Sequence, residues 1–424
     1  MPRLMPIQGL RFSPKAGPLD QLLAPPFDVI GEREREHLSG LSPHNAVRLE
    51  LAEEADDHYT GVAAELEGWI ADGILQRDTE PMLYVYEQEF IEEGLPRKRR
   101  ALLCGVESQP WEAGAVLPHE FTLSAPKEDR LRLLQATGTQ FSPIFMLARD
   151  RSGQLAALLT NTAEGLQPIA SGKTNDGVTH HLWVIPADRD HLRQLAPLLS
   201  EAFYIADGHH RYETSVAYRA WLHTHEGKLA NDHPARFAMA GVVPVEDEGL
   251  IVRPLHRYIP RKAPSDWRER LEHLFDIEEV SVDIEPLKLE AVRQKAQEAI
   301  VAVHLTPKTV HLIRPKNDAA IGKLAPAGAS PRWASAAPIL LRLGVLDPLW
   351  AISDEELRAG AVTFTHDVSE IVEALEGGGV GFLLQPVPAS EVIGLADGGE
   401  RLPQKSTFYY PKMGTGLVFA PLSH

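Results

Sequence analysis

The sequence predicts a mixed α/β protein of the α+β kind, and three observations lead to that prediction. Apolar residues make up 44% of the 424 residues, which is enough for a sizeable core and too many for a disordered chain. Runs rich in β-branched and aromatic residues are mixed with runs of helical apolar spacing, without strict strand–helix alternation. Glycine and proline are scattered as turn residues rather than gathered in one tract.

Helices are expected where apolar residues recur every three or four positions among polar ones. In 56–73, for example, Val62, Leu66, Trp69 and Ile70 share one face, and Gly73 predicts the end of the helix. The other expected helices cover 31–41, 125–135, the first part of 151–173, 188–199, 212–224, 267–274, 285–303, 339–343, 354–359 and 368–375.

Strands are expected where a short run of β-branched or aromatic residues is bounded by turn residues. The runs 82–90 and 101–107 predict an antiparallel hairpin with a long polar turn between them. The other expected strands cover 143–147, 181–185, 203–206, 237–243, 250–253, 277–282, 309–314, 381–384 and 408–410. Prolines interrupt a basic segment after 257, so we expect one region at 1–257 and a second at 258–424.

The charge balance excludes several classes of partner. Lys and Arg number 42 against 59 Asp and Glu, a formal net charge of −17. That excess argues against general nucleic-acid binding and against an anionic membrane surface. One cysteine, Cys104, allows neither an intrachain disulfide nor a thiolate zinc cluster. With no apolar run of bilayer length and no signal-like N-terminus, a cytoplasmic protein is expected.

The most informative segment is Asp207-Gly-His-His-Arg211, which follows an apolar strand and opens a helix. Gly208 permits a positive φ, and the first amides of a helix are unpaired and attract anions. Arg211 adds a planar cation, and His209 and His210 add further donors. The segment therefore predicts a phosphate-binding turn. The alternative is an ordinary polar turn between strand and helix.

A second candidate segment is Leu117-Pro-His-Glu-Phe-Thr122. Glu120 has the chemistry to deprotonate a hydroxyl or hold Mg²⁺, and His119 to bind phosphate or metal. The alternative is a capping loop, in which a hydroxyl of Thr122 or Ser124 binds the first amides of the next helix. The residues alone leave these two interpretations open.

The third candidate segment runs from Leu402 to Gly414 and contains Lys405, Ser406 and Thr407. A lysine followed by two hydroxyls suits a small anionic molecule, although the spaced glycines of a Walker A loop are absent. The alternative is a solvated turn before a final strand. The pair His180–His181 shows no second set of ligands at metal spacing, so we expect surface histidines there.

These segments resemble motifs of known protein families. The turn at 207–211 resembles that of the ParB/sulfiredoxin-like superfamily, and its Asp-Gly-His-His-Arg sequence is most similar to the free-serine kinase branch. The whole chain resembles a large prokaryotic family of proteins of unknown function. Its recurring motifs stand here in order at 24–30, 45–49, 118–122, 141–145, 206–212, 254–257 and 405–412.

The resemblance implies a ParB/sulfiredoxin-like core around 203–224. It also implies a phosphotransferase that uses ATP or ADP with Mg²⁺ on a small hydroxyl substrate such as free L-serine. The expected catalytic residues are Glu120, Asp207, His119 and His209, with Glu120 and Asp207 also as metal ligands. The expected substrate and phosphate contacts are Gly208, His210, Arg211, Lys405, Ser406, Thr407, Asp28, Arg48 and Arg257.

Two other functions stay open at this point. The chain can instead be a non-catalytic, nucleotide-responsive binding protein. It can also run the reaction in reverse and dephosphorylate phosphoserine with a diphosphate acceptor.

Overall fold

The computed structural model describes the whole chain except residues 53–57, 123, 318–321, 323 and 424. The described residues form two compact units. Unit 1 comprises Met1–Pro118, Thr122–Ile251 and Pro411–His424, and unit 2 comprises His119–Phe121 and Val252–Tyr410. The chain thus contributes a short segment to unit 2 at 119–121, passes to unit 2 again after residue 251 and returns to unit 1 at 411. Each unit is described by itself below.

Unit 1 is built on a large mixed sheet with the strand order β6-β11-β8-β12-β5-β4-β10-β9, and β1 pairs with β5. The pairs β6–β11 and β8–β12 are parallel, whereas the pairs from β12 to β9 are antiparallel. The strand bounds are β1 Leu4–Met5, β4 Met82–Glu92, β5 Leu95–Glu107, β6 Val116–Leu117, β8 Ile144–Ala148, β9 Ala170–Lys173, β10 Thr179–Pro186, β11 Phe203–Asp207 and β12 Phe237–Pro244.

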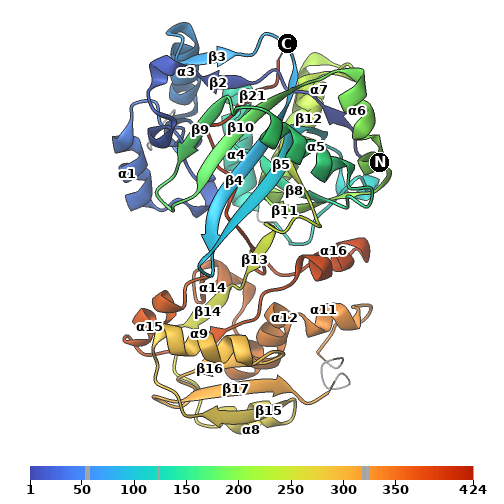
Figure 1. Cartoon of the computed structure of the whole chain (residues 1–424). Coiled ribbons are helices and arrows are strands. Elements are labelled where there is room, and N and C mark those ends of the chain that lie inside the picture. Colours follow the sequence, from blue (N-terminus) through green and yellow to red (C-terminus); the bar gives the residue numbers. More distant parts are fainter. Residues whose placement is uncertain (53–57, 123, 318–321, 323, 424) are drawn as a thin grey trace. The chain divides into compact units, whose positions relative to one another are not determined.

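Helices cover this sheet and form a second core beside it. In Figure 1, α5 lies across β4, β5 and β10, and its leucines join the main apolar core of the sheet. The N-terminal helices and α4 enclose a separate apolar cluster around Trp69 and Phe419. The helix bounds are α1 Glu32–Leu41, α2 Val47–Glu50, α3 His58–Ala71, α4 Ser124–Thr137, α5 Gln154–Gly165, α6 Arg189–Gln194 and α7 His209–Glu226. Two short pairs, β2 (Leu10–Phe12) with β3 (Leu75–Arg77) and β7 (Thr139–Gln140) with β21 (Ala420–Pro421), complete the unit.

Unit 2 contains a six-stranded antiparallel sheet with the order β15-β17-β16-β19-β14-β18. Its strands are β14 His256–Ile259, β15 Phe275–Val280, β16 Ile300–Val303, β17 Val310–Pro315, β18 Thr363–Thr365 and β19 Val380–Leu383. Its helices are α8 Trp267–Glu272, α9 Pro286–Lys295, α11 Pro331–Ser335, α12 Ala337–Leu341, α13 Asp347–Trp350, α14 Asp354–Arg358, α15 Val368–Leu375 and α16 Ala389–Asp397. The short strands β13 (Ile251–Arg253) and β20 (Phe408–Tyr410) lie where the chain passes between units.

The structure confirms the predicted mixture of helices and strands, and it corrects several boundaries. The long polar turn predicted at 91–100 is wrong. β4 and β5 continue until Glu92 faces Leu95, and Glu93 and Gly94 turn the chain with φ values of 50° and 76°. Both central residues at positive φ are typical of the tight turns that match strand twist.

The predicted helix at 285–303 is also wrong in its second half. α9 ends at Lys295, and Ile300–Val303 forms the fully buried strand β16. Four consecutive apolar residues with three β-branched members favour a strand buried on both faces. The predicted helix at 188–199 ends at Gln194, and a 3-10 turn at 196–200 follows.

The prediction that His180 lies on the surface is wrong as well. Its side chain is 3% exposed on β10, and the Tyr86 hydroxyl lies 2.7 Å from its Nδ1. Burial lowers the pKa of His180 to about 4, so the ring is neutral at pH 7. Across the described residues, every helix is too short or too polar to reach from one side of a bilayer to the other.

Candidate functional site

The Asp-Gly-His-His-Arg turn lies in unit 1, between the buried strand β11 and the helix α7. β11 pairs with β8, and the register shifts between Ile205 and Asp207. Such an irregularity redirects the end of a strand, and Asp207 is its last residue. Gly208 then adopts φ 93° and ψ 31°, and α7 runs from His209 for 18 residues. Gly208, the residue at the cap position of α7, has no side chain to bind the first amides, so this end of a long helix suits an anion.

Asp207 is held between two cations. Its Oδ1 accepts a hydrogen bond from the Lys412 ammonium, and its Oδ2 lies 2.7 Å from Arg211 Nη2. The three side chains are only 10–13% exposed. Arg211 also donates to the Pro143 carbonyl oxygen at 2.7 Å, and its guanidinium lies 4.0 Å from Asp28. We call Asp207, Arg211 and Lys412 the ion triad.

The ion triad changes the chemistry expected of Asp207. Burial opposes ionisation of this carboxyl, but the charges of Lys412 and Arg211 outweigh it and hold its pKa well below the usual range. A carboxylate with so low a pKa is a weak general base. Its geometry is that of an anchor that fixes two cations at the start of α7.

Gly208 is required by this arrangement. Its φ of 93° is one that other residues adopt only with strain, and a Cβ there would lie 3.0 Å from Arg211 Nε. The guanidinium therefore packs directly against the glycine. Arg211, which we expected to add a planar cation for phosphate, uses two of its N–H groups on the Pro143 carbonyl oxygen and on Asp207.

Some of the other predicted residues of unit 1 lie in the turn, and others lie outside it. His209 is 7% exposed, whereas His210 is half-buried in the first turn of α7. Arg48, on α2, donates to the Ser39 carbonyl oxygen at 3.0 Å. Thr122, which we considered as a helix cap, instead donates to Glu213 of α7 at 2.8 Å, and the side chain of Ser124 lies outside the described residues.

A second group of predicted residues lies in unit 2, around Glu120. The Glu120 carboxylate accepts backbone hydrogen bonds from Lys405 at 3.3 Å, Ser406 at 3.0 Å and Thr407 at 3.2 Å. Successive amides that converge on one anion form a backbone nest. The 405–407 segment thus binds an anion, as predicted for an external ligand, but that anion is a side chain of the same unit. We call this arrangement the Glu120 nest.

Neighbouring side chains hold the Glu120 nest in shape. His119, 1% exposed, places its Nε2 2.9 Å from the Thr407 hydroxyl oxygen. Arg257, which is buried, donates to the Lys405 carbonyl oxygen at 2.6 Å. Ser406 donates to the Pro403 carbonyl oxygen at 2.6 Å. Lys405 itself is exposed and has a positive φ of 60°.

Replacing Glu120 tests how strongly the nest depends on its anion. The Glu120→Gln variant should expose the 405–407 amides, because hydrogen bonds to a charged acceptor contribute about 1.5–3 kcal/mol each. We expect amide hydrogen exchange at 405–407 to accelerate by at least about tenfold. The Lys405→Gln variant changes only an exposed side chain and should leave exchange at Ser406 and Thr407 nearly unchanged. Equal exchange in Glu120→Gln and the parent protein would contradict a structural role for the carboxylate.

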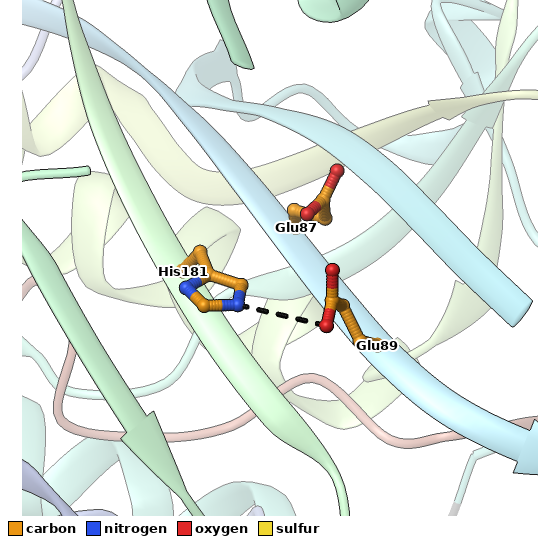
Figure 2. A group of neighbouring side chains, drawn as sticks. All are labelled: Glu87, Glu89 and His181. Atoms are coloured by element: carbon orange, nitrogen blue, oxygen red, sulfur yellow. Dashed lines mark ion pairs between the residues drawn. The ribbon is translucent and has the colours of Figure 1, made fainter. Parts of the chain in front are cut away.

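Both predicted Mg²⁺ ligands, Asp207 and Glu120, contact protein groups in the structure. Both oxygens of Asp207 and both oxygens of Glu120 already accept hydrogen bonds from protein groups. Among the described residues, the group of side chains close enough to share a metal ion is a different one, Glu87, Glu89 and His181. Figure 2 shows these three side chains on the adjacent strands β4 and β10, with His181 Nε2 3.9 Å from Glu89.

This group is an ion-pair network rather than a metal centre. Arg100 Nε lies 2.5 Å from Glu87, and Lys98 Nζ lies 2.5 Å from Glu89. The strand register explains the pairing, since Glu87 faces Arg100 and Glu89 faces Lys98 across β4 and β5. The hydrogen bond from Lys98 lowers the pKa of Glu89. Two cations already compensate the two carboxylates, so we assign no metal to this group.

The structure therefore assembles most of the predicted residues into two groups, one in each unit, whereas Arg48 contacts Ser39. Lys412 is the site residue that the sequence did not single out. It stands at the end of the 405–412 motif, but nothing in its spacing indicated that it pairs with Asp207.

Comparison with known proteins shows the family. The model described as "Protein of unknown function (DUF1015)" matches residues 4–357. No curated protein matches the chain.

Several solved structures resemble the chain at low identity. A variant of a free serine kinase in complex with ADP is 13% identical, covers 70% of this chain and 84% of its own, and has a TM-score of 0.34. SbnI with a C-terminal truncation, from Staphylococcus aureus, is 12% identical over 76% of this chain and 87% of its own, with a TM-score of 0.37. A conserved hypothetical protein from Pyrococcus furiosus is 15% identical over 73% and 92%, with a TM-score of 0.34. Because the family model covers most of its length, this chain belongs to the DUF1015 family.

Proposed function

We propose that this chain is a nucleotide-dependent phosphotransferase that binds the phosphates of ATP or ADP at the start of α7. The observation that carries the proposal is the N-terminus of an 18-residue helix that lacks a side-chain cap and is reached through Gly208 at φ 93°. The amides of the first helical turn and the positive end of the helix stabilise phosphate oxygens. The strand–turn–helix at 203–226 is, in this proposal, a ParB/sulfiredoxin-like core, in line with what the sequence resemblance implies.

The proposed acceptor is a small hydroxyl compound such as free L-serine. Its oxygen forms a bond to the transferred phosphorus, the bond to the nucleotide leaving group breaks, and the hydroxyl proton passes to a base. Phosphoryl transfer depends mainly on positioning and charge stabilisation. Since the low pKa of Asp207 makes it a weak base, we give the ion triad the task of fixing the turn. We assign no residue as the base, and we derive no step through Mg²⁺.

A second function is favoured by one specific observation. Both carboxylates that the sequence offered as bases already accept hydrogen bonds from protein groups at each of their oxygens. A protein that binds a nucleotide without transferring its phosphoryl group needs no base. A nucleotide-responsive binding protein is therefore the alternative.

One experiment separates the two functions. The purified chain is mixed with ATP or ADP, Mg²⁺ and L-serine, and phosphoserine is followed by phosphorus NMR. Formation of phosphoserine that requires both the chain and the nucleotide, and that is lost in Gly208→Ala, supports the phosphotransferase. Saturable nucleotide binding without product across a panel of small hydroxyl compounds supports the binding protein. Absence of nucleotide binding contradicts both.

The position of the phosphates is tested at Gly208. The Gly208→Ala variant should weaken nucleotide binding by about tenfold or more, because the new Cβ strains the turn and displaces the Arg211 guanidinium. Gly177 is a matched control in unit 1, since it has a φ of 84° and a Cβ added there would meet no described atom within 4 Å beyond its chain neighbours. Gly177→Ala should cost similar backbone strain and leave nucleotide affinity unchanged. Equal nucleotide affinities in Gly208→Ala and Gly177→Ala would contradict the proposal that the phosphates bind at this turn.

A further inference from the structure

A groove of about 660 Å³ lies in unit 1 and shares no lining residue with the turn at 207–211. Its floor is made by three neighbouring strands, in which Met5, Gly105 and Met239 stand side by side across β1, β5 and β12. Gly105 has no side chain, and a Cβ there would lie 3.0 Å from the Cβ of Phe237 and 3.3 Å from the Met5 carbonyl oxygen. The missing side chain leaves a hollow between two methionines and a phenylalanine.

The walls of the groove are apolar and stiff. Five prolines line it, namely Pro6, Pro81, Pro186, Pro234 and Pro421. Because the ring fixes φ, proline-rich walls lose little conformational freedom when a ligand binds. The volume falls within the range of about 300–1,000 Å³ that is typical of small-molecule sites. The groove is thus largely formed before any ligand arrives.

The charged residues that line the groove are all acidic. They are Glu80, Asp188 and Asp232, and the described part of the chain contributes no lysine, arginine or histidine to the lining. Asp188 also caps α6 by accepting from the amides of Asp190 and His191 at 3.0 and 2.9 Å. Three exposed carboxylates around an apolar hollow favour a ligand with an apolar body and a positive charge, and disfavour an anion.

We propose that this groove is a second ligand site, which takes an apolar molecule carrying an amine or another cationic group. The methionine thioethers and the Phe237 ring contact the apolar body. One or more of the three carboxylates pair with the cation. This site does not depend on the proposed nucleotide function.

Methyl NMR of the full chain tests the proposal directly. The six methionines supply separate methyl signals. Met5 and the buried Met239 line the groove, whereas Met146 and Met413 are buried outside its lining. The probes are octylamine, octan-1-ol and octanoate, which share chain length and differ in head-group charge. Octylamine should shift the Met5 and Met239 signals saturably and bind about tenfold more tightly than octan-1-ol, with octanoate the weakest.

Two variants locate the contacts. Asp188→Asn keeps a good helix cap and, combined with Glu80→Gln and Asp232→Asn, should abolish the preference for octylamine while leaving octan-1-ol binding unchanged. Ala187→Trp, at a half-buried position in the lining, should fill the groove and weaken all three probes.

Several outcomes would overturn the proposal. They are equal affinity for octylamine and octan-1-ol, equal shifts at all six methionines, or no saturation by octylamine. A lysine- and leucine-containing peptide that saturates the Met5 and Met239 shifts where octylamine does not would assign the groove to a polypeptide partner. If the chain forms a dimer at higher protein concentration and octylamine then no longer shifts the Met5 and Met239 signals, the groove is the binding site of a second copy of the chain.

Discussion

The Asp207→Asn variant should lose about 3–5 kcal/mol of the free energy of unfolding of unit 1, because the substitution leaves two buried cations without their carboxylate. Arg211 and Lys412 are each only 10–13% exposed, so water cannot replace the lost charge cheaply. The loss is measured by urea denaturation and by hydrogen exchange of the β11 and α7 amides.

A double variant separates the ion triad from simple loss of packing. Asp207→Asn combined with Lys412→Met should be less destabilising than the sum of the two single variants, because the second substitution removes one of the stranded cations. Glu128→Gln is the control, since Glu128 forms an exposed i,i+4 pair with Arg132 and its loss should leave unfolding unchanged. Additive effects of Asp207→Asn and Lys412→Met would show that the triad is not energetically coupled.

The second large effect is acid destabilisation through two buried histidines. Burial lowers the pKa of His180 in unit 1 to about 4 and that of His256 in unit 2 to about 3. In the unfolded chain both histidine side chains titrate near pH 6.5. Below that pH, the unfolded chain therefore binds protons that the folded chain does not bind until the pH is lower. Stability should therefore be level above about pH 6.5 and fall by about 1.4 kcal/mol per pH unit for each histidine as the pH drops toward 4.

At pH 5 this amounts to about 2 kcal/mol for each unit. Hydrogen exchange of β10 reports His180, and exchange of β14 and β19 reports His256, whose Nδ1 accepts from the Leu384 amide at 3.2 Å. His180→Gln and His256→Gln should each flatten the pH dependence of their own unit, whatever they do to its stability at pH 7. His223 is exposed, and His223→Gln should leave both slopes unchanged. An unaltered slope in His180→Gln would place the acid-sensitive group elsewhere.

Local patterns were good guides to the strands and helices of this chain. Strands such as β4 and β12 and helices such as α1 and α15 lie close to where apolar spacing predicted them. The wrong predictions have separate causes. At 285–303, the helical spacing of Leu289, Val292 and Ala296 leads into the apolar residues 299–303 with no glycine or proline between them, so the spacing alone does not show where the helix ends and the strand begins.

In the candidate site too, local patterns predicted the backbone, whereas tertiary contacts decided the side-chain partners. The strand, the glycine at positive φ and the helix at 203–226 follow from residue types, because backbone conformation depends on near neighbours. The partners of the charged side chains do not follow from residue types. Lys412 reaches Asp207 across 205 positions of sequence, and Glu120 reaches Thr407 across 287.

The burial of His180 and the hydrogen bonds that Glu120 accepts are further cases in which distant segments decided the chemistry. Composition and spacing identified which residues can carry charge, turn the chain or donate hydrogen bonds. Whether a given carboxylate is a free base or an occupied anchor depended on which groups the fold brought within about 3 Å of it, since hydrogen bonds act only at that range. Long-range packing, and no local pattern, sets those distances.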